Sequence, residues 1–257
     1  MRFCVWDTSS KVGSVALFEA QPEAVRPECR AELTLDATAV HSERLLWAID
    51  ELLTNQRWKI RDLDFLAVGR GPGSFTGLRI GVTTARSLAQ GLDAPVVGFS
   101  SLRALGIPIA EAAAEKTGEP YIIASTDAAK GELFVAGGEA SQWRNGGPKE
   151  RVMEPAAMRL HLEQVLSQRG SDAPWIAVGE AVLRYPRYFE GLPGERREPR
   201  EASSHSVRAA ELGTLVWREF LEKKAVRFSE LHPNYLRASS AEQKLRAGAL
   251  PPGPTRI

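Results

Sequence analysis

The segment FCVWDTSSKVGSVALF, residues 3–18, contains two apolar runs joined by a short polar turn. Residues 3–6 predict one strand, and residues 13–18 predict a second strand that returns beside it. The Asp, Thr and Ser side chains of residues 7–10 readily bond their own backbone, as turn residues do. The segment therefore predicts a β-hairpin at the start of the chain.

The residues after this hairpin predict alternating strands and helices. Residues 31–35 alternate apolar and polar side chains and predict a third strand, and short apolar runs at 65–68 and 96–99 predict two more. Apolar residues at helical spacing predict a helix over 42–53, and a second helix is predicted over 76–90. This order predicts a meander followed by crossover connections with parallel pairing.

The second half of the chain repeats the order in weaker form. Residues 121–124 and 133–136 predict a second hairpin, and later runs predict a helix over 155–167, a strand over 175–179 and a long helix over 204–221. Two such units predict an α/β protein with the duplicated βββαβα plan of the actin, Hsp70 and sugar-kinase (ASKHA) class. We expect a first lobe at residues 1–102, a second lobe at 103–237 and a disordered tail at 238–257.

Composition argues against several classes of protein. The 257 residues carry a formal net charge of +1, which argues against a strongly basic surface for nucleic acid. The two cysteines, Cys4 and Cys29, are too few for a disulfide framework. No apolar run approaches the ~20 residues of a membrane span, and Asp7 comes too early for a signal peptide. We therefore expect a cytoplasmic protein.

The most specific motif is the glycine-rich run GPGSFTGLRIG, residues 71–81. Its glycines allow positive φ angles, and the loop ends at a predicted helix N-terminus. Exposed amides and the helix dipole could bind an anion there, and the alternative is a tight strand-to-helix turn. The run lacks the lysine of a nucleoside-triphosphate P-loop.

The helix predicted after this loop has small residues four apart, Gly77, Gly81, Ala85 and Ala89, which therefore lie on one face. Glycine inside a helix costs about 0.5–1 kcal/mol relative to alanine, so another backbone is expected to approach closely. That backbone belongs either to the chain's own sheet or to another subunit. For the second case we predict a seam made by both first-lobe helices, with Trp47 beside it as an aromatic anchor or as ordinary core. The predicted seam contains Leu45, Leu46, Ile49, Leu53, Leu78, Gly81, Val82, Ala85 and Ala89.

The first turn occupies the position at which kinases of this class hold the phosphates of a metal-bound nucleotide. A candidate vestigial phosphate loop combines this turn with the glycine-rich run, in residues Asp7, Thr8, Ser9, Gly71, Gly73 and Ser74. The alternative is a hairpin turn satisfied by its own side chains. On the adenosine side the chain has Gly179 followed by Glu180, and a carboxylate there would repel a triphosphate. We expect no cofactor, and ATP binding by this chain alone is not predicted.

No pattern in the sequence indicates catalysis or a metal site. The four histidines, His41, His161, His205 and His232, lie far apart in the chain, and no cysteine or carboxylate cluster accompanies them. A Gly-x-Ser-x-Gly nucleophile motif does not occur. We expect neither a catalytic residue nor a metal ligand.

Several of these stretches resemble the TsaB family, also called YeaZ. They are VWDTS at 5–9 with SVAL at 14–17, HSERLL at 41–46, the run at 71–81, DAAKGELF at 127–134 and PNYLR at 233–237. The resemblance covers nearly the whole chain up to Arg237, and the glycine-rich run is highly specific. It implies an actin-like fold.

The resemblance also implies a non-catalytic subunit of bacterial tRNA modification. The product is N6-threonylcarbamoyladenosine (t6A) at position 37, beside the anticodon, in tRNAs that read codons beginning with A. A separate enzyme makes threonylcarbamoyl-AMP, the paralogue TsaD transfers the group to tRNA, and the ATPase TsaE joins the complex. Pairing with TsaD through the two first-lobe helices, homodimers through the same face, and tRNA contact only through the complex are further implications.

Proteins that resemble TsaD carry a His-x-x-x-His metal pair just after the strand that follows the second helix. The corresponding positions here are Ser101 and Leu105, neither of which can replace an imidazole ligand. This difference favours the non-catalytic member. Two alternatives stay open: a small-molecule phosphotransferase of the actin-like class, and a homologue of the M22-type glycoproteases.

Overall fold

A computed structural model describes residues 1–35, 41–113, 119–199 and 205–237 of the chain. The tail predicted at 238–257 lies outside these residues. Among the described residues, none of the helices combines the length and the apolar character that crossing a bilayer requires.

The first sheet has five strands in the order β3–β2–β1–β4–β5. β1 pairs antiparallel with β2 and β2 with β3, whereas β1–β4 and β4–β5 are parallel. Helix α1 and a short 3-10 turn, η1, connect β3 to β4, and α2 connects β4 to β5. The elements are β1 (Arg2–Asp7), β2 (Gly13–Glu19), β3 (Glu28–Leu35), α1 (His41–Asn55), η1 (Ile60–Asp62), β4 (Phe65–Gly69), α2 (Phe75–Leu92) and β5 (Val96–Phe99).

The second sheet repeats this topology, because its order β8–β7–β6–β9–β10 has the same sequence of antiparallel and parallel pairs. The predicted duplicated actin-like plan is confirmed. The short strand β8 was not predicted, because two of its four residues are charged. The elements are β6 (Tyr121–Asp127), β7 (Leu133–Glu139), α4 (Ala140–Arg144), β8 (Glu150–Met153), α5 (Pro155–Ser167), β9 (Pro174–Val178), α6 (Glu180–Arg184), η2 (Pro186–Tyr188) and β10 (Glu195–Arg196).

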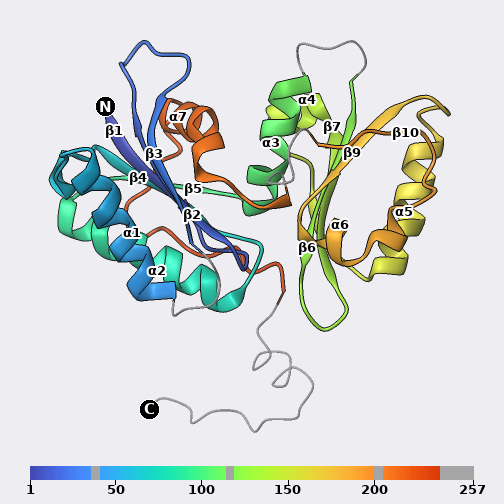
Figure 1. The fold of residues 1–257 in the computed structure, drawn as a ribbon, viewed down its shortest axis with the longest axis horizontal. Helices are drawn as coiled ribbons and strands as arrows, with labels where there is room; N and C mark the ends of the chain where they lie inside the picture. Colours follow the sequence, from blue (N-terminus) through green and yellow to red (C-terminus); the bar gives the residue numbers. More distant parts are fainter. Residues whose placement is uncertain (36–40, 114–118, 200–204, 238–257) are drawn as a thin grey trace, which may run out of the picture.

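The two sheets and their helices form alternating layers (Figure 1). Helices α1 and α2 cover the outer face of the first sheet, α5 covers the outer face of the second, and α3 (Ser101–Ala113), α4 and α7 (Gly213–Leu221) lie between the sheets. Strand β1 faces both ways: Phe3 and Val5 belong to the inner core, and Cys4 and Trp6 to the outer one. Burial on both faces explains why β1 is an unbroken apolar run.

Helix α3 links the lobes and was not predicted, because Gly106 and Pro108 interrupt its sequence. Its Gly106 packs on the ring of Trp143, where no Cβ would fit. The core around α3 is continuous from the inner face of the first sheet to that of the second. The boundary predicted at residue 102 therefore falls inside one helix.

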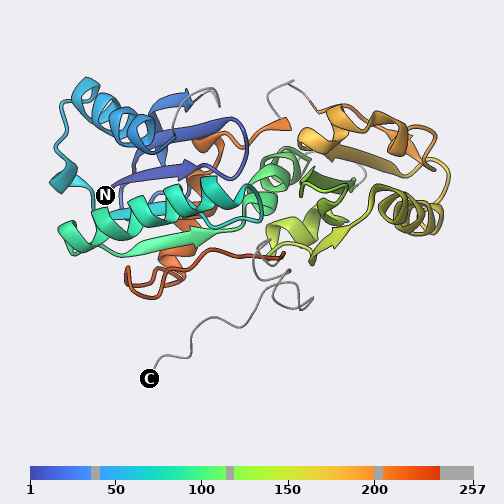
Figure 2. The same cartoon turned by 90° about the horizontal axis from the view of Figure 1, so that it is seen from below.

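The last part of the chain returns to the first lobe, as the red segment in Figure 2 shows. The Trp217 ring of α7 stacks 6.0 Å from Phe3, and Phe220 stacks 4.0 Å from Phe65. Val226 then forms an antiparallel bridge with Val96 of β5. The prediction of one continuous second lobe over 103–237 is therefore wrong for its final part.

The long helix predicted over 204–221 is also shorter than expected. The described residues form a 3-10 turn, η4 (Ala209–Glu211), and then α7 from Gly213 to Leu221. Gly213 lies where a Cβ would overlap the Phe18 ring, so packing against β2 determines how this segment is placed.

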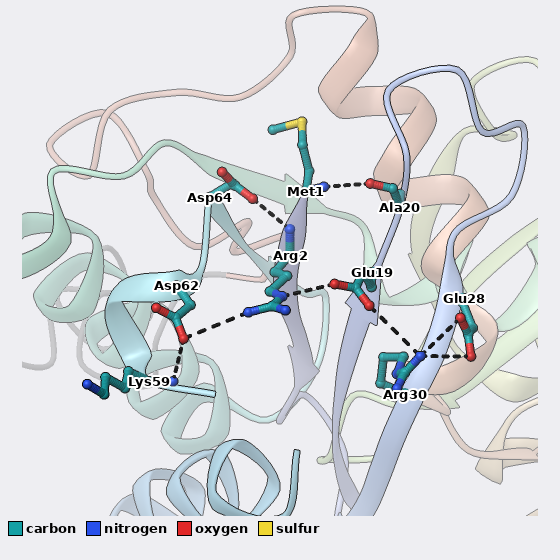
Figure 3. A network of polar contacts seen from close by, with 9 residues as sticks. All are labelled: Met1, Arg2, Glu19, Ala20, Glu28, Arg30, Lys59, Asp62 and Asp64. Carbon is teal, nitrogen blue, oxygen red and sulfur yellow. Dashed lines mark hydrogen bonds and ion pairs between the residues drawn. The ribbon is translucent and has the colours of Figure 1, made fainter. Parts of the chain in front are cut away.

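A polar network fastens one end of the first sheet (Figure 3). The Arg2 amide donates to Asp64 at 2.6 Å, and its guanidinium donates to Glu19 at 3.0 Å. Arg30 continues the chain of contacts to Glu28. Pairs this exposed contribute about 0–1 kcal/mol each, so the network orients the strand ends more than it stabilises them.

Replacing Trp217 by alanine tests the assignment of α7 to the first lobe. The buried ring stacks on three phenylalanines, and its Nε1 donates to the Ala24 carbonyl at 2.7 Å. We expect a loss of about 3–5 kcal/mol in the free energy of unfolding, measured with denaturant. The control Leu221→Ala, exposed on the same helix, should change it by less than about 0.5 kcal/mol. Equal effects of the two changes would contradict the assignment.

Candidate functional site

The turn after β1 is fastened by a buried carboxylate. Asp7 is 1% exposed and accepts hydrogen bonds from the amide and hydroxyl of Ser9, at 2.8 and 2.6 Å, and from the Ser101 hydroxyl at 2.6 Å. Ser101 also accepts from the Gly71 amide at 3.2 Å. Burial raises the pKa of Asp7, and these hydrogen bonds act in the opposite direction. The carboxylate therefore faces the protein interior and organises the turn.

The start of α2 packs directly on this turn. The Thr8 hydroxyl donates to the Gly77 carbonyl at 2.7 Å, and the Ser74 amide donates to the Ser9 carbonyl at 2.6 Å. A Cβ at Gly77 would overlap the Thr8 carbonyl, and one at Gly81 would overlap its hydroxyl. The backbone that the small-residue face was expected to meet is thus the chain's own hairpin.

A cavity of about 670 Å³ lies between the lobes. It is lined by both hairpin turns, by the start of α2 and by the C-terminal residues 234–237. Of the six residues of the candidate phosphate loop, only Ser9, Gly73 and Ser74 line it. Asp7 and Thr8 turn inward, and Gly71, at φ +101°, packs on Leu78.

Residues 234–237 form part of the lining of this cavity and contact both lobes. Tyr235 lies 5.1 Å from the Phe75 ring of α2, and Arg237 donates to the carbonyls of Ala128 and Ala129 in the second hairpin. The PNYLR run was recognised only as a family signature, and nothing in its pattern indicated that it spans the two lobes. Sequence reasoning therefore missed these lining residues.

Two carboxylates that line the cavity, those of Asp127 and Glu180, interact with neighbouring groups. Asp127 forms an ion pair with Arg184, and Glu180 accepts from the Asp127 amide at 3.3 Å. Lys11 and Arg79 also line the cavity. Glu180 lines it too, so the cavity carries both signs of charge.

The predicted seam on α1 and α2 is corrected by the structure, except at Leu46. The other members are buried within the chain, most of them in its own outer core against β1, β2 and β4, because helices that cover a sheet turn their apolar face to it. Leu78 instead lines the cavity, and Gly81 lies against Thr8. These buried members are Leu45, Ile49, Leu53, Leu78, Gly81, Val82, Ala85 and Ala89.

The exposed apolar part of α1 is smaller. Leu46 is 49% exposed and Trp47 is 55% exposed, while the adjacent Leu45 and Ala48 are buried. Both exposed side chains are large and apolar. The sequence marked Trp47 as either anchor or core, and the structure places it on the surface.

The positions that correspond to the paralogue's metal pair hold buried residues of α3. Ser101 bonds to Asp7, and Leu105 belongs to the inner core. Within the part of the chain that the structure describes, no group of three or more His, Cys, Asp or Glu residues could hold a metal ion.

Known proteins resemble this chain over almost its full length. It is 30% identical to the tRNA threonylcarbamoyladenosine biosynthesis protein TsaB of Escherichia coli (strain K12), over 95% of this chain and 98% of that protein. It is 32% identical to the TsaB protein of Haemophilus influenzae, over 93% of this chain and 94% of that one. The chain belongs to the TsaB family.

Two further comparisons agree with membership of the TsaB family. Residues 35–179 match the family model described as TsaD, tRNA N6-adenosine threonylcarbamoyltransferase. The solved structure of YeaZ from Pseudomonas aeruginosa superposes with a TM-score of 0.68 at 26% identity, covering 91% of this chain and 99% of that one. In this TsaB-family chain, the glycine-rich run and the PNYLR run both line the cavity, where Phe75 contacts Tyr235.

Two glycine-to-alanine changes in α2 should have opposite effects. Gly77→Ala places a methyl group against the Thr8 carbonyl, so we expect it to destabilise the chain by about 1–3 kcal/mol. Gly91→Ala meets no atom within 4 Å and should stabilise the helix by about 0.5–1 kcal/mol. Denaturant unfolding measures both, and stabilisation by Gly77→Ala would refute the close contact.

Asp7→Asn should change how stability depends on pH. The raised pKa of Asp7 means that the folded chain holds a proton at pH values where the unfolded chain, at the ordinary value of 3.8, has lost it. The protonated Asp7 side chain therefore stabilises the fold fully below pH 3.8, and this stabilisation is lost as the pH rises through the pKa of Asp7 in the folded chain. Thermal unfolding measured as the pH is raised above 3.8 should show the wild type losing stability relative to Asp7→Asn. Parallel curves would contradict this account.

Proposed function

We propose that this chain is the non-catalytic subunit that pairs with the TsaD transferase in forming t6A at position 37 of tRNAs that read codons beginning with A. The observation that carries the proposal is its full-length similarity to curated proteins named for tRNA threonylcarbamoyladenosine biosynthesis. The match of residues 35–179 to the transferase model supports a paralogous relation to the proposed partner.

A supporting rather than catalytic role is consistent with how the polar groups of the first turn are used. The Asp7 carboxylate and the Thr8 hydroxyl are both bonded within the chain. Ser101 and Leu105 offer no imidazole at the positions of the paralogue's metal pair. We therefore propose that this chain contributes no catalytic residue and no cofactor, and that the chemistry takes place on TsaD.

The surface proposed for pairing is the exposed part of α1 around Leu46 and Trp47. Tryptophan is enriched among residues that dominate binding energies, because it buries a large area with few rotatable bonds. Helix α1 lies on the outer face of the first sheet, on the side turned away from the second lobe (Figure 1). The same surface would serve homodimers.

We further propose that TsaE joins the paired complex and that this chain reaches tRNA only through that complex. The complex is proposed to work in the cytoplasm.

The alternatives find less support. A phosphotransferase would need hydroxyls and a carboxylate free to hold a metal-bound nucleotide, but Asp7 and Thr8 face inward, and Glu180 lines the cavity. A metal-dependent peptidase would need ligands that Ser101 and Leu105 do not supply.

Replacing Leu46 and Trp47 together by glutamate should abolish or strongly weaken pairing with TsaD. Loss of an aromatic anchor costs about 2 kcal/mol or more, which corresponds to a dissociation constant raised at least about 30-fold. Size-exclusion chromatography of the mixed proteins measures the pairing, and t6A formation on tRNA in the presence of the other components measures the consequence.

The control is Leu160→Glu, which places one glutamate on a 61% exposed leucine of α5 in the second lobe. It should leave both pairing and t6A formation unchanged. A heterodimer that survives the double change, or loss of pairing in the control alone, would refute the assignment of the surface. Ala85→Arg is unsuitable as a test, because Ala85 is fully buried and the variant would be expected to unfold.

A further inference from the structure

A second, smaller cavity lies on the outer face of the second sheet, beneath α5. Its volume is about 60 Å³, and its lining comes from β6, β7, β8 with the residue before it, and α5. Three side chains that carry or can carry positive charge line it: Lys149, Arg151 and His161. Within the described part of the chain, no carboxylate lines it.

The register of β8 explains how these charges gather. Arg151 pairs with Val135 of β7, and successive residues of a strand point to opposite faces. Lys149 and Arg151 therefore face α5, while Glu150 between them faces the other side and bonds to Ser100 and Asn234. Lys149 and Arg151 are both exposed, and among the described residues neither forms an ion pair.

Tyr121 adds an unused donor. Its side chain is 7% exposed and lines the cavity, and its hydroxyl makes no hydrogen bond to any described residue. The hydroxyl lies against Gly137, where a Cβ would come within 2.9 Å of it. The phenol is therefore free to donate a hydrogen bond to an anion that enters the cavity.

We propose that this cavity binds a phosphate group. A phosphate oxyanion accepts hydrogen bonds in several directions at once, which suits a guanidinium, an ammonium and a phenol that converge from different elements. At about 60 Å³ the cavity is too small for a nucleoside. The phosphate group belongs either to a free phosphate ester or to a nucleic-acid backbone.

The imidazole of His161 provides a way to detect a phosphate group bound in this cavity. His161 Nε2 lies 3.5 Å from Arg151 Nη1, and burial together with the charge of Arg151 lowers the pKa of His161. The groups that face it are Arg151 and Lys149 from the β8 side and Tyr121 from β6. A bound phosphate would reverse the balance, because a negative charge at contact distance favours the protonated ring.

The experiment is an NMR titration of the histidine signals of the full chain, with inorganic phosphate as the probe. The His161 signal is assigned with the variant His161→Gln. We expect millimolar phosphate to raise the pKa of His161 by about one unit or more, because an opposite charge within contact distance shifts a pKa by that order. The signals of His205 and His232, which do not line the cavity, should not move.

Matched variants separate this site from general charge effects. Lys149→Gln and Arg151→Gln should each abolish or reduce the phosphate-dependent shift, whereas Arg227→Gln, an exposed arginine of the first-lobe segment, should leave it intact. Circular dichroism of each variant checks its fold. A pKa of His161 that phosphate does not change, or a shift that persists in Arg151→Gln, overturns the proposal.

A second arm distinguishes the two sources of the phosphate group. A short single-stranded RNA is titrated at the same total phosphate concentration as the inorganic probe. Equal shifts of His161 support a site for free phosphate esters, and a larger shift with RNA supports a site for the backbone. Absence of a shift in both arms overturns the site. The outcome does not depend on TsaD pairing, because the cavity lies on the lobe that does not carry α1.

Discussion

The Asp7 carboxylate joins the first hairpin to the helix that connects the lobes, and much of the architecture depends on this contact. Its oxygens accept from Ser9 within the turn and from Ser101, which is 94 residues away at the start of α3. A carboxylate buried this completely is tolerated only while its hydrogen bonds are made, because removing them would leave a desolvated polar group without a partner. The ends of β1 and α3 therefore have to stay together.

The same contacts determine what the first turn is able to do. Thr8 bonds to Gly77, and the glycine of α2 is required because the turn occupies the space of a side chain. Groups that would face a nucleotide in an actin-like kinase thus serve to lock helix against hairpin. In this chain, the polar groups of the first turn are therefore used for packing between the hairpin and α2.

The inner faces of the two sheets are buried in one shared core, whereas the outer faces are not joined to each other. The inner sides of both sheets share one apolar cluster through α3, and α7 adds a stack of aromatic rings to it. Opening the lobes widely would expose this cluster to water at a large free-energy cost. The outer faces are under no such constraint, and they carry the exposed pair on α1 and the cationic cavity beneath α5.

The sequence by itself determined the duplicated order of strands and helices, because hydrophobic periodicity is a local property that does not depend on distant partners. It also identified the family, through the glycine-rich run. It could not separate Leu45 from Leu46, which are equally apolar neighbours, yet one is buried and the other is half exposed. Only the direction in which α1 meets its sheet decides between them.

The tertiary structure alone also decided where distant segments meet. The return of α7 depends on rings of Trp217 and Phe3 stacking across almost the whole chain length, which no local pattern encodes. The cavity beneath α5 depends on the register of β8, a four-residue edge strand whose charged residues gave no strand signal. Both features follow from side-chain packing between elements, so they become visible only when the elements are assembled.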